Sequence, residues 1–382
     1  MILVVNAGSS SIKVALFDAA LAPVAGAAVT EIGGAARLRL GGQERDCAAP
    51  DHDAALGLIL SALAAAGHPV AAIAAAGHRV VHGGGSLVRP ARVTEEVAAA
   101  IEACIPLAPL HNPHNLAAIR ALARLVPDLP QVACFDTAFH ATNPDVARRY
   151  ALPSSETARG IRRYGFHGIS FASLAARLPA LLGAMPERVL ALHLGNGASL
   201  CAIRGGQSVA TTMGYSPLDG LTMGTRAGSI DGNAVLRLAA EHGIEGAARI
   251  LNHQSGLLAL GGASDMRALH AAGTERARFA IAHFCYWAVR HSGSMIAAMG
   301  GLDCVAFTGG IGENDAEVRA AIAAGLAFAG VTVEPEANAR HAARLDPPGA
   351  AVPVLIVPAA EERWIAEETV RIVAGPPGRA AP

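Results

Sequence analysis

Residues 2–17 read ILVVNAGSSSIKVALF, and this stretch decides the fold. Two runs of β-forming apolar residues, 2–5 and 12–17, flank small polar residues at 6–11. That pattern predicts a β-hairpin closed by a turn of small residues.

The same pattern returns in the middle of the chain, where residues 189–203 read VLALHLGNGASLCAI. It predicts strands over 189–194 and 200–203, with a turn over 195–199. Two strand–turn–strand units far apart in one chain indicate a duplicated architecture.

A third unit is predicted to consist of a strand over 305–308, a glycine-rich loop at 309–312 and a helix. Asn314 is the expected N-cap of that helix, with Glu317 as its capping-box partner. The helix is expected to end near Gly325, or at the latest near Gly330.

Further helices are expected over 274–299 and after Glu361. Strands alternating with helices indicate the α/β class. A length of 382 residues favours two domains, and the boundary is placed at 145/146. The tail over 375–382 is rich in glycine and proline and is expected to fray.

Composition narrows the class of protein. Hydrophobic residues make up 52% and charged residues 16%, with a formal net charge of -1, so neither a disordered chain nor a broadly basic nucleic-acid binder is expected. The apolar start lacks a basic region, and the alanine-rich stretch 54–76 is too broken to span a bilayer. No membrane partner and a cytoplasmic location are therefore expected. The six cysteines form no C-x-x-C pair and are expected to be buried in a reducing compartment.

Lysine occurs once, as Lys13, so the other 29 basic residues are arginine. Lys13 alone can supply a side-chain ammonium, whereas every other permanent cation is a planar guanidinium. Its place just behind the first small-residue turn makes it a candidate phosphate ligand.

Three small-residue loops follow strands, at 6–11, 195–199 and 309–312. Backbone N–H groups in such loops can approach phosphate oxygens closely. The P-loop, G-x-G-x-x-G and G-x-S-x-G patterns are absent, so a nucleotide would be bound by another architecture. Each loop taken alone could be an ordinary turn.

Several segments place polar or charged residues in otherwise apolar surroundings. They are 78–84, the loop predicted at 110–115, 135–140, 164–168, 216–228 and 263–267. Phosphoryl transfer to an anion needs positioning and positive charge, which arginine forks and a Mg²⁺ held by carboxylates can supply. The set therefore favours phosphoryl transfer, with guanidinium groups, an imidazole and a divalent cation converging on one phosphate.

A zinc hydrolase is the competing hypothesis. His78 and His82 have H-x-x-x-H spacing, and His111 and His114 have H-x-x-H spacing. Both pairs lie in stretches with glycine or proline, and no H-E-x-x-H occurs, so zinc is disfavoured.

Together these motifs resemble the acetate kinase (acetokinase) family, within the superfamily of acetate and sugar kinases and actin. The matching blocks run in the family's order along nearly the whole chain. They are NAGSSSIK at 6–13, HRVVHGG at 78–84, APLHNP at 108–113, FDTAFH at 135–140, YGFHG at 164–168, HLGNGAS at 193–199, SPLDGLTMGTR at 216–226, SDMR at 264–267, FTGGIGEN at 307–314 and PAAEE at 358–362.

The resemblance implies two duplicated actin-like (ribonuclease H-like) domains with a cleft between them. The N-terminal domain, 1–145, would be completed by a C-terminal helix over 361–382, and 146–360 would form the nucleotide-binding domain. It further implies direct in-line transfer between ATP and acetate, giving acetyl phosphate and ADP. Mg²⁺ (or Mn²⁺) would be the cofactor, and the chain would form a homodimer.

The resemblance also implies roles for individual residues. The catalytic residues would be Asp136, His167 and Arg226. The acyl substrate would contact Arg79 through its carboxylate and an apolar pocket through its methyl group, the pocket being formed by Val81, Leu110, Phe166 and Pro217. The metal site would use Asn6 and Glu361.

The implied ATP-binding residues lie at the small-residue loops and at the SDMR block. They are Lys13, His193, Leu194, Gly195, Asn196, Gly197, Asp265, Met266, Arg267, Gly310, Ile311, Gly312, Glu313 and Asn314.

The chain departs from the family's usual pattern at six positions. They are Ile169, Phe171, Ala227, Ser229, Ala359 and Ala360. The departures spare the residues named above, and any effect is expected on Mg²⁺ or nucleotide contacts. A propionate kinase with the same mechanism remains an alternative, as does a non-catalytic nucleotide-binding regulator of the same fold.

Overall fold

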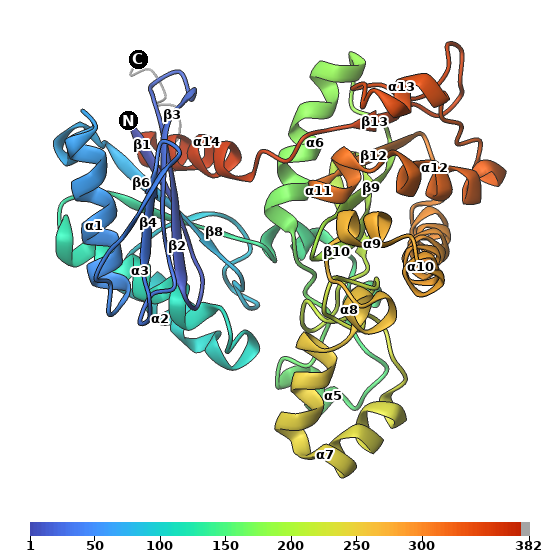
Figure 1. Cartoon of the computed structure of the whole chain (residues 1–382), viewed down its shortest axis with the longest axis horizontal. Coiled ribbons are helices and arrows are strands. Elements are labelled where there is room, and N and C mark those ends of the chain that lie inside the picture. Colours follow the sequence, from blue (N-terminus) through green and yellow to red (C-terminus); the bar gives the residue numbers. More distant parts are fainter. Residues whose placement is uncertain (376–382) are drawn as a thin grey trace, which may run out of the picture. The chain divides into compact units, whose positions relative to one another are not determined.

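The structure, a computed structural model, describes residues 1–375 and separates into two compact units (Figure 1). Unit 1 comprises residues 1–139 with the described part of 360–382, and unit 2 comprises residues 140–359. The expected domain boundaries, after 145 and after 360, lie close to these divisions, and the domain assignment stays a prediction. Residues 376–382, which include most of the expected frayed tail and the end of the expected 361–382 helix, lie outside the described residues.

In the described part of unit 1, eight strands form one sheet in the order β5-β4-β3-β2-β1-β6-β8-β7. The strands are β1 (Ile2–Ala7), β2 (Ser11–Phe17), β3 (Pro23–Thr30), β4 (Arg37–Leu40), β5 (Gln43–Asp46), β6 (Ala75–Val80), β7 (Ala91–Arg92) and β8 (Gln131–Phe135). The predicted hairpin is β1 and β2, which pair antiparallel, whereas β1, β6 and β8 run parallel. The carboxyl ends of β1, β6 and β8 therefore meet at one edge of the sheet.

Helices cover both faces of this sheet. They are α1 (His52–Ala65), α2 (Glu95–Ala103), α3 (Asn112–Leu125) and α14 (Glu361–Ala374), with 3-10 turns η1 (Val70–Ala72), η2 (Ile105–Leu107) and, running on into unit 2, η3 (Ala138–Thr142). The main core lies where apolar residues of α1 and α3 meet those of β1 and β2. Helix α14 contacts β6, β1 and β8.

In the described part of unit 2, a five-stranded sheet has the order β11-β10-β9-β12-β13. The strands are β9 (Arg188–Leu194), β10 (Ala198–Arg204), β11 (Gln207–Thr211), β12 (Cys304–Thr308) and β13 (Val354–Ile356). Strand β9 pairs antiparallel with β10 and parallel with β12, as β1 does with β2 and β6. The segments β3-β2-β1-β6-β8 and β11-β10-β9-β12-β13 thus share order and directions, which confirms the predicted duplication.

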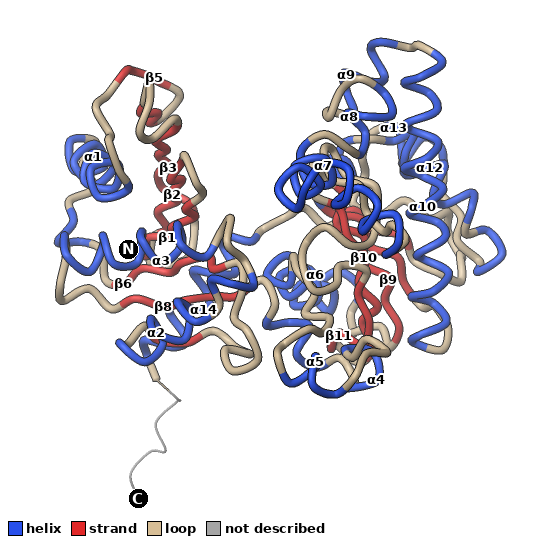
Figure 2. Tube along the Cα trace, turned by 90° about the horizontal axis from the view of Figure 1, so that it is seen from below, coloured by secondary structure: helices blue, strands red, loops and turns tan. Residues whose placement is uncertain are grey.

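Helices α6 and α10 lie on opposite faces of the second sheet (Figures 1 and 2). The helices of unit 2 are α4 (Asp145–Arg148), α5 (Ser154–Ala158), α6 (Gly168–Leu182), α7 (Gly232–His253), α8 (Gly256–Gly261), α9 (Met266–Ala272), α10 (Glu275–Met299), α11 (Gly309–Asn314), α12 (Ala316–Gly325) and α13 (Pro335–Ala339), with a 3-10 turn η4 (Ala327–Ala329). The predicted long helix is α10, whose N-cap, Thr274, accepts a hydrogen bond from the N–H of Ala277.

Two local predictions are wrong. Residues 309–312 form the first turn of α11 and not an open loop, and the N-cap of α12 is Asp315, not Asn314. The Asp315 side chain accepts from the N–H of Val318, whereas the Asn314 amide donates to the carbonyl of Gly310 within α11.

The loop predicted at 110–115 is also wrong in part, because Asn112 begins α3. Pro113 stands in the first turn, where its missing N–H breaks no helical hydrogen bond.

The burial of the cysteines agrees with the prediction. Cys47 is partly buried, the other five are buried, and all six are free thiols. No helix among residues 1–375 is long and apolar enough to cross a membrane.

Close packing of α14 on β6 depends on Gly77. A Cβ built there would lie 2.6 Å from Cγ2 of Ile365 and would also collide with the hydroxyl of Thr369. We expect Gly77→Ala to lower the free energy of unfolding by roughly 1–3 kcal/mol through overpacking. Urea unfolding measures the change.

Gly57 in α1 is the matched control, since a Cβ there meets nothing within 4 Å. Gly57→Ala is expected to stabilise the chain by roughly 0.5–1 kcal/mol, because alanine is the better helix former. Equal effects of the two alanines would contradict the packing argument.

Candidate active site

A first group of predicted site residues lies at the edge of the unit 1 sheet where β1, β6 and β8 end. Arg79 Nη2 donates to Asp136 Oδ2 at 2.7 Å, and Arg79 Nε lies 3.3 and 3.2 Å from the two carboxylate oxygens. Arg79 Nη1 also reaches the amide oxygen of Asn6 at 3.4 Å. Three residues from distant parts of the sequence are therefore held together by one guanidinium fork.

The Arg79–Asp136 pair is largely removed from water, with 3% of the Asp136 side chain exposed against 27% for Arg79. The negative charge of Asp136 raises the pKa of Arg79 above its usual value. Burial nevertheless raises the pKa of Asp136, because desolvation of the carboxylate outweighs the attraction of Arg79. The ion pair is thus tight but costly to bury, as expected of a functional pair more than a stabilising one.

Oxygen donors suited to a hard divalent cation gather at this edge. The charge of Glu361, the first residue of α14, acts on both Asp136 and Arg79. Lys13 is the cross-strand partner of Asn6, so the two side chains share one face of the hairpin. The carboxylates and the Asn6 amide fit Mg²⁺ or Mn²⁺.

Zinc ligation receives no support from the described residues. Within 1–375, no group of three or more His, Cys, Asp or Glu side chains is arranged to hold a metal ion. His78 and His82 are both buried in unit 1.

Two buried asparagines of α3 fix the loop after β6. Asn112 accepts from the N–H of His82 at 3.1 Å and donates to its carbonyl at 2.9 Å. Asn115 accepts from the N–H of Val81 at 3.0 Å and donates to the carbonyl of Ala7 at 2.8 Å. These side chains tie the ends of β1 and β6 together and so set where Arg79 stands.

A second group of predicted site residues lies in unit 2, around Gly197. A Cβ on Gly197 would lie 2.8 Å from Arg226 Nη2 and 3.1 Å from His167 Nε2, so only glycine leaves room beside these two groups. Arg226 Nη1 donates to the carbonyl of Pro217 at 2.6 Å. The structure thus brings together two of the three predicted catalytic residues.

Arg226 has no carboxylate within ion-pair distance in the described part of the chain, although Arg79 has one. Burial alone lowers the pKa of Arg226 below its ordinary value. A partly buried guanidinium without a counter-ion is a binding site for an anion.

The imidazole of His167 is fixed from two sides. Its Nδ1 lies 2.9 Å from the hydroxyl of Ser199. Its ring stacks on that of His193 with centroids 4.3 Å apart, and His193 Nδ1 is in turn 2.8 Å from the hydroxyl of Ser170. The ring is therefore preorganised beside Arg226.

The predicted nucleotide segments meet at the carboxyl ends of β9 and β12. His193 and Thr308 are neighbours across these strands, and a Cβ on Gly195 would lie 3.9 Å from the N of Gly310. The carbonyl of Asn196 accepts from the N–H of Gly224, which connects this edge to the Arg226 segment. Leu194 is fully buried, so its predicted role in nucleotide binding could involve only its backbone.

The α11 segment, Gly309–Asn314, is anchored by hydrogen bonds from other residues of unit 2 and from its own Glu313. Glu313 Oε1 accepts from the N–H groups of Gly309 at 3.0 Å and Ala359 at 2.9 Å. Arg319, fully buried in α12, donates to the carbonyls of Gly312 and Glu313 at 3.0 and 2.9 Å. These bonds leave Gly310 exposed and Ile311 partly exposed.

The predicted residues 265–267 begin α9. Asp265 is its N-cap, and hydrogen bonds from the side chain and backbone of Arg267 lower the pKa of Asp265 to about 2. Asp265 and Arg267 are exposed, whereas Met266 is buried.

The four residues of the predicted acyl pocket are divided between the units. Val81 and Leu110 belong to unit 1, and Phe166 and Pro217 belong to unit 2. Leu110 is 56% exposed, whereas Val81 and Phe166 are buried. Their joint role stays a prediction.

The departures from the family pattern have local explanations. Ile169 and Phe171 are buried core residues of α6, and Phe171 meets the ring of His193 edge-on. Ser229 donates to Asp219 Oδ1 at 2.7 Å, and Ala359 contributes its N–H to Glu313. The structure offers no explanation for Ala227 or Ala360.

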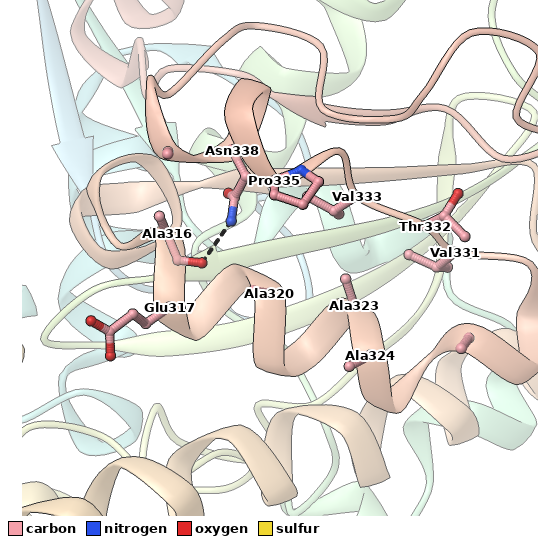
Figure 3. A pocket seen from close by; sticks show the side chains of 12 residues that line it. Ala316, Glu317, Ala320, Ala323, Ala324, Val331, Thr332, Val333, Pro335 and Asn338 are labelled. Carbon is pink, nitrogen blue, oxygen red and sulfur yellow. Dashed lines mark hydrogen bonds between the residues drawn. The ribbon is translucent and has the colours of Figure 1, made fainter.

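Away from these residues, a pocket of about 480 Å³ lies between α12 and α13 (Figure 3). Its lining is mainly alanine and valine. The polar side chain of Asn338 is engaged on both ends: it donates to the carbonyl of Ala316 (Figure 3), and it accepts from Arg319. The pocket is therefore a mainly apolar cavity, and its lining does not indicate a particular reaction.

The two sheets define the structural class of the protein. Two sheets with matching strand order and directions, each opening with a hairpin, make this an actin-like α/β chain with a duplicated fold. Each sheet carries a guanidinium at or near the carboxyl ends of its parallel strands.

The chain belongs to the acetokinase family, whose model matches residues 1–367. An acetate kinase of Rhodopseudomonas palustris is 43% identical over 396 residues, covering 98% of this chain and 99% of that protein. The crystal structure of Porphyromonas gingivalis acetate kinase has a TM-score of 0.92 and 37% identity, covering 97% of this chain and 99% of that one. A propionate kinase structure from Francisella tularensis has a TM-score of 0.92 and 34% identity, covering 97% and 98%.

His78, beside Arg79 in β6, generates a pH prediction. Burial lowers its pKa from 6.5 to about 4, with a smaller opposing effect of Gln131. The folded state therefore favours the neutral ring, so this stability is present above pH 6.5 and is lost as the pH falls towards 4.

We expect His78→Gln to remove this dependence. Urea unfolding at stepped pH should show the wild type losing up to about 3 kcal/mol relative to the variant between neutral pH and pH 4. Parallel stability curves for the two proteins would contradict the assignment.

Proposed function

We propose that this protein is an ATP-dependent acetate kinase, which moves the γ-phosphoryl group of ATP reversibly to acetate. An acetate oxygen forms a bond to the γ-phosphorus while the bond from that phosphorus to the β–γ bridging oxygen breaks, giving acetyl phosphate and ADP. Membership of the acetokinase family supports this activity.

One observation carries the proposal: Arg226 and His167 flank Gly197, and Arg226 has no carboxylate partner among the described residues. The transferring phosphoryl group spreads its charge over three oxygens, and fixed donors stabilise it best where water is excluded. A guanidinium and an oriented imidazole around a glycine suit such a group.

Arg79 is assigned to the acceptor carboxylate. Asp136 already aligns its guanidinium through Nε and Nη2, so little side-chain entropy remains to be lost on binding. Val81, Leu110, Phe166 and Pro217 are assigned to the methyl group.

The nucleotide is assigned to Lys13 and to the segments 193–197, 265–267 and 310–314. Small residues at 195, 197, 310 and 312 allow backbone N–H groups to approach phosphate oxygens. Mg²⁺ or Mn²⁺ would be held by Asn6 and Glu361, near Asp136, and when bound would neutralise charge on the ATP phosphates.

We also propose a cytoplasmic homodimer that takes no nucleic acid or membrane as a partner. The net charge of -1 supports the absence of a nucleic-acid partner. Two large side chains of α10, Phe279 and Tyr286, are 58% and 62% exposed and supply apolar surface for a contact between copies.

Replacement of either arginine tests the proposal directly. We expect Arg79→Ala and Arg226→Ala each to lower acetyl hydroxamate formation from acetate, ATP and Mg²⁺ by at least about 10²–10³-fold, because a charge-stabilising donor is lost. Circular dichroism should show the wild-type fold in both variants.

Arg188→Ala is the matched control. Arg188 pairs with Asp303 at the start of β9, the opposite end of that strand from His193, and we expect near-normal turnover. Near-normal turnover in the Arg79 and Arg226 variants would defeat the assigned roles. An inactive wild type that still binds ATP would favour the non-catalytic regulator.

Chain-length preference separates acetate from propionate, which the Francisella tularensis relative makes the second candidate. An apolar pocket gains only about 1–3 kcal/mol from one methylene. We expect kcat/KM to be highest for acetate, lower for propionate and lowest for butyrate in a coupled assay with ATP and Mg²⁺. A higher kcat/KM for propionate or butyrate would replace acetate as the assigned substrate.

A further inference from the structure

We infer that His140 is a positioning residue, which holds the turn Gly165–His167 so that the His167 ring faces Gly197 and Arg226. This inference rests on the proposed function, because it concerns the orientation of a proposed catalytic group. The hydrogen bond that connects His140 to this turn runs to the backbone carbonyl of Phe166.

The first support is the position of the His140 ring. It is fully buried, and its Nε2 lies 2.9 Å from the carbonyl oxygen of Phe166, the residue before His167. A carbonyl can only accept a hydrogen bond, so Nε2 must carry a proton. The peptide that joins Phe166 to His167 is therefore held by a directed bond from the core.

Steric fit gives independent support. Gly165 has a φ of +79°, and a Cβ on it would lie 2.6 Å from Cδ2 of His140 and 2.6 Å from Cγ2 of Thr211. The turn is thus closed directly onto the imidazole ring, and only glycine satisfies both the backbone angle and the contact.

His167 needs such support because its own backbone is strained. It has φ 58° and ψ 21°, in the left-handed region, at the N-cap of α6. A residue other than glycine reaches this region only where the surroundings impose it. In the described structure, the fixed Phe166 carbonyl and the Gly165 contact impose it from one side, and Ser199 holds the ring from the other.

The Nδ1 side of the His140 ring packs against polar and aromatic side chains. Its Nδ1 lies 2.8 Å from the hydroxyl of Ser208 and 3.9 Å from the thiol of Cys201, and Phe171 packs edge-on at 5.7 Å. Burial lowers the pKa of His140 to about 4, so the ring is neutral at physiological pH. A neutral ring that donates from Nε2 to the Phe166 carbonyl is in a single tautomer, with Nδ1 unprotonated.

Two amide substitutions separate positioning from general stability. The amide of glutamine reaches the place of Nε2 and can still donate to the Phe166 carbonyl, whereas that of asparagine reaches only the place of Nδ1. We expect His140→Asn to lower kcat about 10- to 100-fold with KM for ATP and acetate changed less than about threefold. His140→Gln should keep kcat within about fivefold of wild type.

Gly165→Ala should reproduce the kcat loss of His140→Asn, since it displaces the same turn. Leu345→Ala is the control for stability alone: Leu345 is fully buried in unit 2 and pairs with β13, away from the turn. It should lower Tm and leave kcat unchanged. A folded His140→Asn with wild-type kcat would overturn the inference, as would equal kcat losses in the Asn and Gln variants.

NMR of the ring nitrogens gives a readout that needs no turnover. The ¹⁵N shifts of His167 should move in His140→Asn and stay in place in His140→Gln. If the wild type makes no acetyl hydroxamate, the proposed function fails, while these shifts still decide the inference. If His140→Asn does not fold, a shifted His167 signal in folded His140→Gln overturns it.

Discussion

The unit 2 site depends on one constraint: the guanidinium of Arg226 is largely buried and has no carboxylate partner among the described residues. Burial disfavours the charge of Arg226, and the described structure compensates it only through the carbonyl of Pro217. A bound anion with several oxygens can offset this cost, because its oxygens accept hydrogen bonds from the remaining N–H groups of the guanidinium. In unit 1 the corresponding cost is met by Asp136, which turns Arg79 into an aligned fork rather than an open cation.

Both arrangements arise from one piece of strand geometry. In each of the two sheets, the parallel strands have their carboxyl ends at one edge. Each sheet also contains a hairpin whose turn is made of small residues. The turn leaves space at that edge, and neighbouring strands and loops supply the charged groups. Duplication therefore provides two versions of the same edge, one with a carboxylate beside its arginine and one without.

Much of this could be predicted from the sequence because strand and turn signals are local. The hairpins at 2–17 and 189–203 and the helix α10 carry strong signals of periodicity, small turn residues and capping. Asp315 was missed as a cap because Asn314 beside it has the same chemistry, and α11 decides between them by ending at Asn314.

The supporting residues could not be predicted in the same way. Asn112, Asn115 and Arg319 act on backbone groups that are 6 to 108 positions away in the chain. Their only sequence signal is a polar side chain in an apolar surrounding. That signal does not identify the backbone group to which the side chain bonds. His140 is of the same kind: its motif is visible, but its contact with the turn before α6 appears only in three dimensions.

The single lysine has a consequence for chemistry other than phosphoryl transfer. An acyl phosphate, the proposed product, acylates amines, and Lys13 is the one ε-amino group of the sequence, exposed on β2. The amine of Met1 is hydrogen-bonded to the carbonyl of Ala72. Self-modification by the product would thus be confined to very few atoms, and an amine-reactive dye would report on the hairpin of unit 1 almost alone.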